Sequence, residues 1–237
     1  MDYQTIFQRY ELKYQMNLEQ KQLLLDVLGD SLRPDPFGRS TICNIYFDTA
    51  DCRLIRRSLE KPVYKEKLRL RSYGVSTPDN NVFLELKKKY QDVVYKRRVS
   101  IPEAQVMEWL STGGPLPDSS QIGREIDYFR SFYRELFPTV VLSYEREAYY
   151  FARDPGLRVT FDETILWRDE DFSLCSSVYG TPVLSPGQVL MEVKTAGSIP
   201  VDLARLLSEN GIFKTSFSKY GAAYRQMIKE FGGIQYA

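Results

Sequence analysis

Apolar and polar residues alternate with a period of two in eight segments of the chain. This alternation is typical of strands that bury one face and present polar side chains on the other. Turn-forming sequences such as Pro78-Asp79-Asn80 separate neighbouring segments. The predicted strands cover residues 7–14, 41–48, 65–73, 82–89, 93–101, 140–151, 158–163 and 189–194.

Five further segments have the apolar spacing of helices, at residues 17–32, 102–110, 124–136, 200–210 and 216–231. The first begins with Asn17 and has Gln20 three residues later, which is the sequence of a capping box. No repeat or long linker divides the chain. We therefore expect an α+β fold of one domain over residues 1–237. Because about eight strands are enough to close a barrel, we expect a closed eight-stranded antiparallel β-barrel with helices packed outside.

The composition restricts the chemistry. The chain has 237 residues with 32 Lys and Arg against 31 Asp and Glu, so its formal net charge is +1. This balance argues against a protein that coats nucleic acid, which would need a basic excess. Histidine is absent, which excludes Ser-His-Asp and Cys-His catalysis and His-ligated metal centres. A metal would therefore be a hard cation such as Mn²⁺ or Mg²⁺, held by carboxylate and phosphate oxygens.

The cysteines and the hydropathy indicate the compartment. Three cysteines without a C-x-x-C pair favour reduced thiols. No segment has the apolar length of a signal peptide core or a membrane span. We expect a cytoplasmic protein.

One predicted strand carries a basic side chain at every second position, at Lys65, Lys67, Arg69 and Arg71. Alternation places all four on one face, about 6.6 Å apart. At an effective dielectric constant of about 20, neighbours at this spacing repel by roughly 2–2.5 kcal/mol. Carboxylates or a bound polyanion should compensate this repulsion, and the candidate carboxylates are Glu11, Glu85 and Glu192.

Polar faces recur on other strands. They carry Arg9, Glu11 and Lys13; Glu85, Lys87 and Lys89; Tyr144 and Arg146; Arg158 and Thr160; and Glu192 and Lys194. Two interpretations stay open at this point: the solvated face of an ordinary antiparallel sheet, or the charged interior of a barrel that holds an extended polyphosphate. No glycine-rich phosphate loop is present, so side chains would have to hold the phosphates. A closed barrel would also exclude a nucleic-acid duplex.

An ordered series of short motifs resembles the VTC domain family, the polyphosphate polymerase module within the triphosphate tunnel metalloenzyme (CYTH-like) superfamily. The motifs extend over nearly the whole chain, at residues 9–14, 46–49, 67–71, 84–87, 144–146, 157–162, 191–194 and 217–220. Each motif is weak alone, and their order and spacing carry the resemblance. One departure is Arg9, which stands where the wider superfamily has the first Glu of its ExExK signature.

The resemblance implies a tunnel of eight antiparallel strands and a phosphotransferase that moves the γ-phosphoryl group of ATP to inorganic polyphosphate. It implies catalytic contacts from Arg69, Arg71, Lys87, Arg146, Arg158 and Lys219. It implies substrate binding by Arg9, Lys13, Lys67, Tyr144, Lys194 and Ser218. It implies that Glu192 and Glu11 hold the divalent metal, Mn²⁺ or Mg²⁺.

Other interpretations stay open. A metal-dependent triphosphatase of the same fold would use water as the nucleophile, and a non-catalytic module would only bind polyphosphate or inositol phosphates. The basic residues could also form structural ion pairs with Glu85. Lys65, Lys89, Arg97 and Arg98 could guide a polymer or lie on the surface, and Asp48 and Asp162 are expected in turns or caps. A membrane-associated partner protein is not indicated by any residue pattern.

Overall fold

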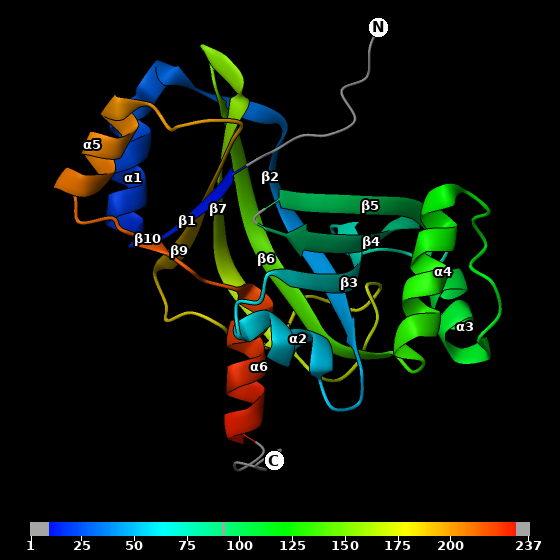
Figure 1. The fold of residues 1–237 in the computed structure, drawn as a ribbon. Coiled ribbons are helices and arrows are strands. Elements are labelled where there is room, and N and C mark those ends of the chain that lie inside the picture. Colours follow the sequence, from blue (N-terminus) through cyan, green and yellow to red (C-terminus); the bar gives the residue numbers. More distant parts are fainter. Residues whose placement is uncertain (1–9, 92, 231–237) are drawn as a thin grey trace, which may run out of the picture. The chain divides into compact units, whose positions relative to one another are not determined.

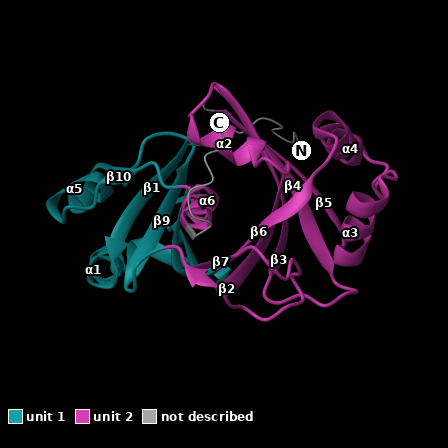
Figure 2. Ribbon diagram, turned by 90° about the horizontal axis from the view of Figure 1, so that it is seen from below, with its two compact units in different colours: residues 1–40, 144–165, 184–217 teal, residues 41–143, 166–183, 218–237 magenta. Residues whose placement is uncertain are grey.

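The computed structural model describes residues 10–91 and 93–230 (Figure 1). Its chain is divided into two compact units (Figure 2). Unit 1 comprises residues 1–40, 144–165 and 184–217, and unit 2 comprises residues 41–143, 166–183 and 218–237. The single-domain interpretation of the sequence stays a prediction.

The described residues form six α-helices and one large antiparallel sheet, which confirms the α+β class. The helices are α1 (Leu18–Leu28), α2 (Arg53–Leu59), α3 (Glu103–Thr112), α4 (Gln121–Tyr133), α5 (Val201–Glu209) and α6 (Lys219–Glu230). The strands are β1 (Tyr10–Asn17), β2 (Leu32–Asp48), β3 (Tyr64–Tyr73), β4 (Asn81–Tyr90), β5 (Val93–Pro102), β6 (Phe137–Phe151), β7 (Asp154–Arg168), β8 (Thr181–Pro182), β9 (Gln188–Thr195) and β10 (Lys214–Thr215).

The sheet has ten strands rather than the eight predicted, because β8 and β10 are two residues long and too short to show alternation. Its hydrogen-bonded order begins at β10 and ends at β5, and the described residues show no pairing between these two strands. The closed barrel predicted from the sequence is therefore not confirmed.

Several predicted boundaries were wrong for local reasons. The first helix ends at Leu28 rather than residue 32, because Gly29 adopts a positive φ of 41° and donates its N–H to Leu25. The following segment, with Pro34 and Pro36, belongs to β2. Helix α2 was not predicted, since its seven residues span too few turns to show a helical period. Part of the first predicted strand, residues 7–9, lies outside the described residues.

In unit 1, the alternation of β1, β7 and β9 separates an apolar face from a polar face. Met16, Phe161 and Met191 are buried with Leu24 of α1 and Leu203 of α5 in one hydrophobic cluster. The helices therefore cover the apolar face, and the residues at intervening positions form the opposite, polar face.

In unit 2, β3, β4 and β5 have the same division. Leu68, Leu70 and Leu84 are fully buried in a cluster that includes Trp109 of α3 and Phe129 of α4. Figure 2 shows both helices beside these strands. The basic side chains of the strands alternate with the leucines and so occupy the other face.

The first helix offers a local stability test. The Asn17 carboxamide oxygen accepts from the Gln20 N–H at 2.8 Å, and the Gln20 side chain accepts from the Asn17 N–H at 2.9 Å, as the sequence predicts. We expect Asn17→Ala to lower the free energy of unfolding by about 1 kcal/mol, because an orphan helix N–H loses its acceptor. Urea unfolding measures this, with Asn17→Asp as the control that keeps an acceptor. An equal loss in both variants would contradict the capping role.

Candidate functional site

The polar face of unit 2 is built from β2 to β5, whose registers place basic residues in rows across the strands. One row is Tyr46, Arg69, Glu85 and Arg98. A second row is Lys67, Lys87 and Lys96. A third contains Asn44 and Arg71. We call these residues, together with Ser218 and Lys219 at the start of α6, the cationic face.

A single carboxylate lies at the centre of the cationic face. Glu85 is 1% exposed, and its oxygens accept from Arg69 Nε at 2.8 Å and Arg98 Nε at 2.7 Å. Lys96 Nζ lies 2.7 Å from the same carboxylate. Burial alone would raise the pKa of Glu85, but Arg69, Arg71 and Lys96 hold it well below its usual range. Glu85 therefore stays ionised and compensates part of the repulsion that the sequence predicts on β3.

The lysine row has an excess of positive charge. Lys67 is the register partner of Lys87, which is in turn the register partner of Lys96. Like charges directly opposite each other on neighbouring strands are destabilising. Burial lowers the pKa of Lys96 to about 8, although Glu85 acts in the opposite direction.

Two contacts orient the other predicted groups of this unit. The buried Arg71 guanidinium donates from Nε to Asn44 Oδ1 at 2.8 Å, and Asn44 in turn donates to the Leu142 carbonyl. Lys67 Nζ lies 3.4 Å from Ser218 Oγ. Lys219, also buried, is the first residue of α6. The structure thus brings Lys67, Arg69, Arg71, Lys87, Ser218 and Lys219 together in unit 2.

The polar face of unit 1 contains the other predicted residues. In register, Lys13 of β1 lies opposite Glu192 of β9, which lies opposite Thr160 of β7. The next row is Glu11, Lys194 and Arg158. We call these six residues, together with Tyr144, Arg146 and Asp162, the mixed face.

Arg146 is held in the mixed face by two hydrogen bonds to one carboxylate. Its Nε and Nη2 donate to the two oxygens of Asp162 at 2.6 and 2.7 Å. Asp162 is fully buried, and the guanidinium also lies 5.2 Å from the Tyr144 ring centroid. Two parallel hydrogen bonds fix the plane of an arginine. Asp162 was expected in a turn or cap, and that prediction was wrong: it is the carboxylate that orients Arg146.

Glu192 is surrounded by three cations. Its oxygens lie 3.5 Å from Lys13 Nζ, 3.6 Å from Arg146 Nη2 and 3.9 Å from Lys194 Nζ. Lys13 Nζ also lies 3.5 Å from Glu11. Arg158, by contrast, is about half exposed and pairs with Asp35 on β2. Arg9 lies outside the described residues.

Several residues of these faces were not predicted as site residues. Lys96 follows the period-two pattern of residues 93–101, which is a signal that could have identified it. Asn44, Tyr46 and Asp162 carry no such signal, because their partners come from other strands. Of the four residues that could guide a polymer or lie on the surface, Arg98 binds Glu85, and Arg97 pairs with Glu125 of α4. Asp48 accepts from the N–H groups of Leu54 and Ile55, which confirms its expected capping role.

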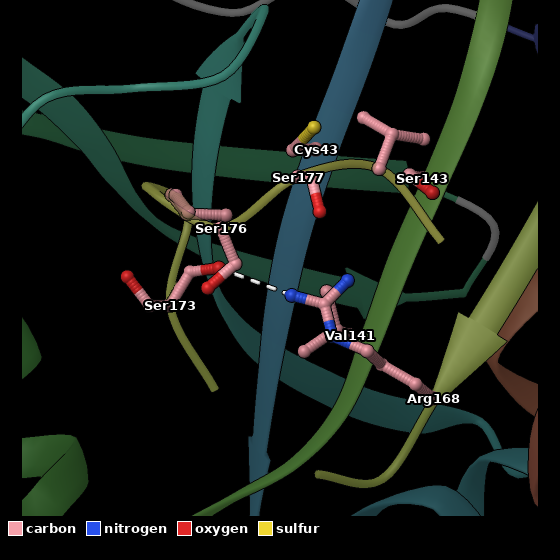
Figure 3. A pocket seen from close by; sticks show the side chains of 9 residues that line it. Cys43, Val141, Ser143, Arg168, Ser173, Ser176 and Ser177 are labelled. Atoms are coloured by element: carbon pink, nitrogen blue, oxygen red, sulfur yellow. Dashed lines mark hydrogen bonds between the residues drawn. The ribbon is translucent and has the colours of Figure 1, made fainter. Parts of the chain in front are cut away.

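A small pocket of unit 2 lies apart from the predicted residues (Figure 3). Cys43, Ser143 and Arg168 contribute to its lining. The buried Arg168 guanidinium donates to the Ser173 carbonyl at 3.2 Å and to the Asp171 carbonyl at 3.0 Å. Arg168 therefore holds the loop that follows β7, which is a structural role. All three cysteines of the chain are free thiols in the structure.

Across residues 10–91 and 93–230, none of the helices combines the length and the apolar character that crossing a bilayer requires.

Comparisons with known proteins identify the family. The model of the VTC domain family matches residues 8–228. A candidate adenylyl cyclase from Hippeastrum with a dominant triphosphatase activity is 22% identical, with a TM-score of 0.55 over 92% of this chain and 95% of that chain. A candidate adenylate cyclase from Vibrio parahaemolyticus is 14% identical, with a TM-score of 0.50 over 93% of this chain and 99% of that chain. No curated protein matches the chain significantly.

At these identities, the likeness to the two solved structures indicates a shared fold only and carries no conclusion about activity. Together with the family match, they support a triphosphate tunnel fold. Because the family model extends over nearly the whole chain, this protein belongs to the VTC domain family.

Proposed function

We propose that this protein is an ATP-dependent polyphosphate polymerase. The observation that carries the proposal is the lysine row Lys67, Lys87 and Lys96, which lies beside arginines that share a single carboxylate. Such a surface fits an extended anion with many oxygens. Membership of the VTC domain family supports the choice of polyphosphate as that anion.

In the proposed reaction, a terminal phosphate oxygen of the polyphosphate attacks the γ-phosphorus of ATP. The new P–O bond extends the polymer by one phosphate, and the bond between the γ-phosphorus and the β–γ bridging oxygen breaks, which releases ADP. The attacking oxygen is already ionised, so no histidine is needed as a base. The residues position the two phosphate chains and neutralise their charge, which supplies most of the rate enhancement of phosphoryl transfer.

Arginine and lysine divide this task. Arg69, Arg71 and Arg146 each present a guanidinium oriented by a neighbouring acceptor, and an oriented fork binds phosphate through two hydrogen bonds. The lysines supply point charges along the chain of phosphates. Arg158, which is half exposed, would contact an anion at the edge of the mixed face.

We place the proposed divalent metal at the mixed face. Thr160 Oγ1 is buried without a hydrogen-bond partner among the described residues, and Thr160 lies opposite Glu192 in the register. The described residues contain no group of three or more His, Cys, Asp or Glu side chains that could hold a metal by themselves. Glu192 and Glu11 would therefore supply some of the oxygen ligands of Mn²⁺ or Mg²⁺, and phosphate oxygens would supply others. Mg²⁺ is commonly bound in this way in nucleotide sites. When bound, the metal neutralises charge on the phosphates.

The enclosed tunnel is part of this proposal and rests on family membership. ATP and inorganic polyphosphate are the proposed partners, and the cytoplasm is the proposed compartment because ATP is the donor. A partner protein in a membrane is not required for the chemistry.

One incubation tests the proposal. The purified protein is mixed with ATP and Mn²⁺, and the phosphate products are separated by length. Long chains together with ADP support the polymerase. Free phosphate alone would overturn it in favour of a triphosphatase. Binding of labelled polyphosphate without turnover of ATP would instead identify a binding module.

A lysine pair on one strand supplies a matched test. Lys87 belongs to the cationic face, whereas its neighbour Lys88 points to the other face of β4. We expect Lys87→Met to lower polymer synthesis about tenfold, since each fixed charge near the transferred phosphate contributes to its stabilisation. Lys88→Met is the control and should keep wild-type activity. Equal activities of the two variants would contradict the assignment of the face, and thermal melting checks that both are folded.

A further inference from the structure

Tyr46 is the one phenol in the arginine row of the cationic face. It is register partner to Arg69, whose Nη1 donates to the Tyr46 hydroxyl oxygen at 3.1 Å. The Tyr46 side chain is buried, so water does not readily replace this hydrogen bond. The Arg69 guanidinium can only donate hydrogen bonds. Its acceptors are Glu85 on β4 and Tyr46 on β2, so it is held from two neighbouring strands.

A second phenol supports the first. The ring of Tyr220 on α6 stacks on the ring of Tyr46, with centroids 4.7 Å apart and planes inclined by 24°. The Tyr220 hydroxyl donates to Asp48 Oδ2 at 2.9 Å. Burial and Asp48 raise the pKa of Tyr220, so this phenol remains a donor. Lys67 Nζ lies 5.7 Å from the Tyr220 ring centroid.

Asp48 fixes this arrangement to the body of unit 2. Its carboxylate accepts from the backbone N–H groups of Thr49, Leu54 and Ile55 and from Tyr220. Gly221 permits the close approach, because a Cβ at this position would lie 2.7 Å from the Leu59 side chain. The start of α6 is thereby held against α2, and Ser218 and Lys219 are part of that start.

We propose that Tyr46 and Tyr220 are positioning residues of the cationic face. Asp48 holds Tyr220, Tyr220 supports the ring of Tyr46, and the Tyr46 hydroxyl orients the Arg69 guanidinium toward phosphate. The inference rests on the proposed function and adds to it: none of these three residues is predicted to touch substrate.

The charges around Tyr46 shift the pKa of its phenol, and this shift offers a way to measure its positioning role. Burial would raise the pKa of Tyr46, but Arg69, Lys67 and Arg71 of β3 lower it to about 8. Tyr220 faces it from α6, and Asp48 follows on its own strand. On β4 and β5, the charged groups of the cationic face are Glu85, Lys87, Lys96 and Arg98. Above about pH 8 the phenolate would neutralise part of the positive charge that phosphate needs.

Lys96 titrates in the same range, so the experiment removes that titration first. The parent protein is Lys96→Arg, which keeps its positive charge at alkaline pH. Tripolyphosphate is the probe, and its dissociation constant is measured between pH 7 and pH 9. We expect Tyr46 to lower the affinity of the parent about tenfold over this range, because its phenol gains most of a negative charge beside the anion. Any change in the ionisation of tripolyphosphate itself is common to all variants and cancels in the comparison.

The double variant Lys96→Arg/Tyr46→Phe should lose this pH dependence and bind about fivefold more weakly at pH 7, the effect of one hydrogen bond. Tyr220→Phe in the same parent should also weaken binding about fivefold but keep the pH dependence. Tyr128→Phe is the control, because Tyr128 is 68% exposed on α4. A purely structural role for Tyr46 would not remove a pH dependence.

Phenolate absorbance gives a readout without ligand. The parent should show one tyrosine ionising near pH 8 that the Tyr46→Phe variant lacks. Tripolyphosphate should move that ionisation to higher pH, because a bound anion disfavours the phenolate. If the two proteins titrate alike, the Tyr46–Arg69 contact is wrong. If they differ but bind tripolyphosphate equally at every pH, the positioning role is overturned and the proposed function stands. If the parent does not bind tripolyphosphate, the proposed function fails and this role fails with it.

Discussion

The Glu192→Gln variant is expected to bind tripolyphosphate at least as tightly as the wild type and to lose about 100-fold in metal-dependent turnover. The two effects have opposite signs because Glu192 has two kinds of neighbour. Lys13, Arg146 and Lys194 surround it, so removing its charge leaves them more attractive to an anion. In the proposed reaction its oxygens also hold the metal, and an amide is a poorer ligand for a hard cation.

Affinity and turnover must be measured separately to test this. Calorimetric titration with tripolyphosphate gives the first, and ADP release in the presence of Mn²⁺ gives the second. Glu209→Gln is the matched control, because Glu209 is exposed on α5. Turnover at the wild-type level would show that Glu192 holds no metal. Weaker binding together with lower turnover would instead indicate that Glu192 is needed to build the mixed face.

The Glu85→Gln variant is expected to lose about 3–5 kcal/mol in the free energy of unfolding, since it leaves buried cations without their counter-charge. Arg69, Lys96 and Arg98 all lie within hydrogen-bond distance of this one carboxylate. Glu125→Gln is the comparison. Glu125 pairs with Arg97 at 2.9 Å but is partly exposed, so its loss should cost less than about 1 kcal/mol.

Urea unfolding at several pH values measures both variants. The pKa of Glu85 is lowered in the folded protein, so its contribution is present at neutral pH and is lost as the pH falls below the ordinary glutamate value of about 4.3. The stability difference between wild type and Glu85→Gln should therefore shrink in acid. A bound polyanion should partly restore the variant's stability, because it replaces the missing negative charge. A difference below about 1 kcal/mol at neutral pH would mean that the cations are solvated rather than held by Glu85.

The sequence was most informative about the faces of the strands. Side chains alternate by covalent geometry, so Lys67, Arg69 and Arg71 had to share a face wherever β3 lay. The structure confirms this division, since Leu68 and Leu70 on the other side are fully buried. Helix capping could also be predicted, because it depends on residues that are close in sequence. The reciprocal contacts of Asn17 and Gln20 are an example.

Helix lengths and short elements were harder to predict. A seven-residue helix such as α2 lacks a readable period, and its start is stabilised by Asp48, a residue outside the helix. The two-residue strands β8 and β10 exist only because longer strands pair with them. Their formation depends on tertiary contacts rather than on local pattern.

By itself the sequence determined which residues are basic, which of them share a strand face, and which family the motifs resemble. Only the tertiary structure decided which acceptor orients each cation: Glu85 for Arg69, Asp162 for Arg146 and Asp35 for Arg158. The reason is physical. Strand alternation follows from bonds within one segment, whereas register and side-chain pairing depend on segments far apart in the chain, whose burial and packing set the final positions.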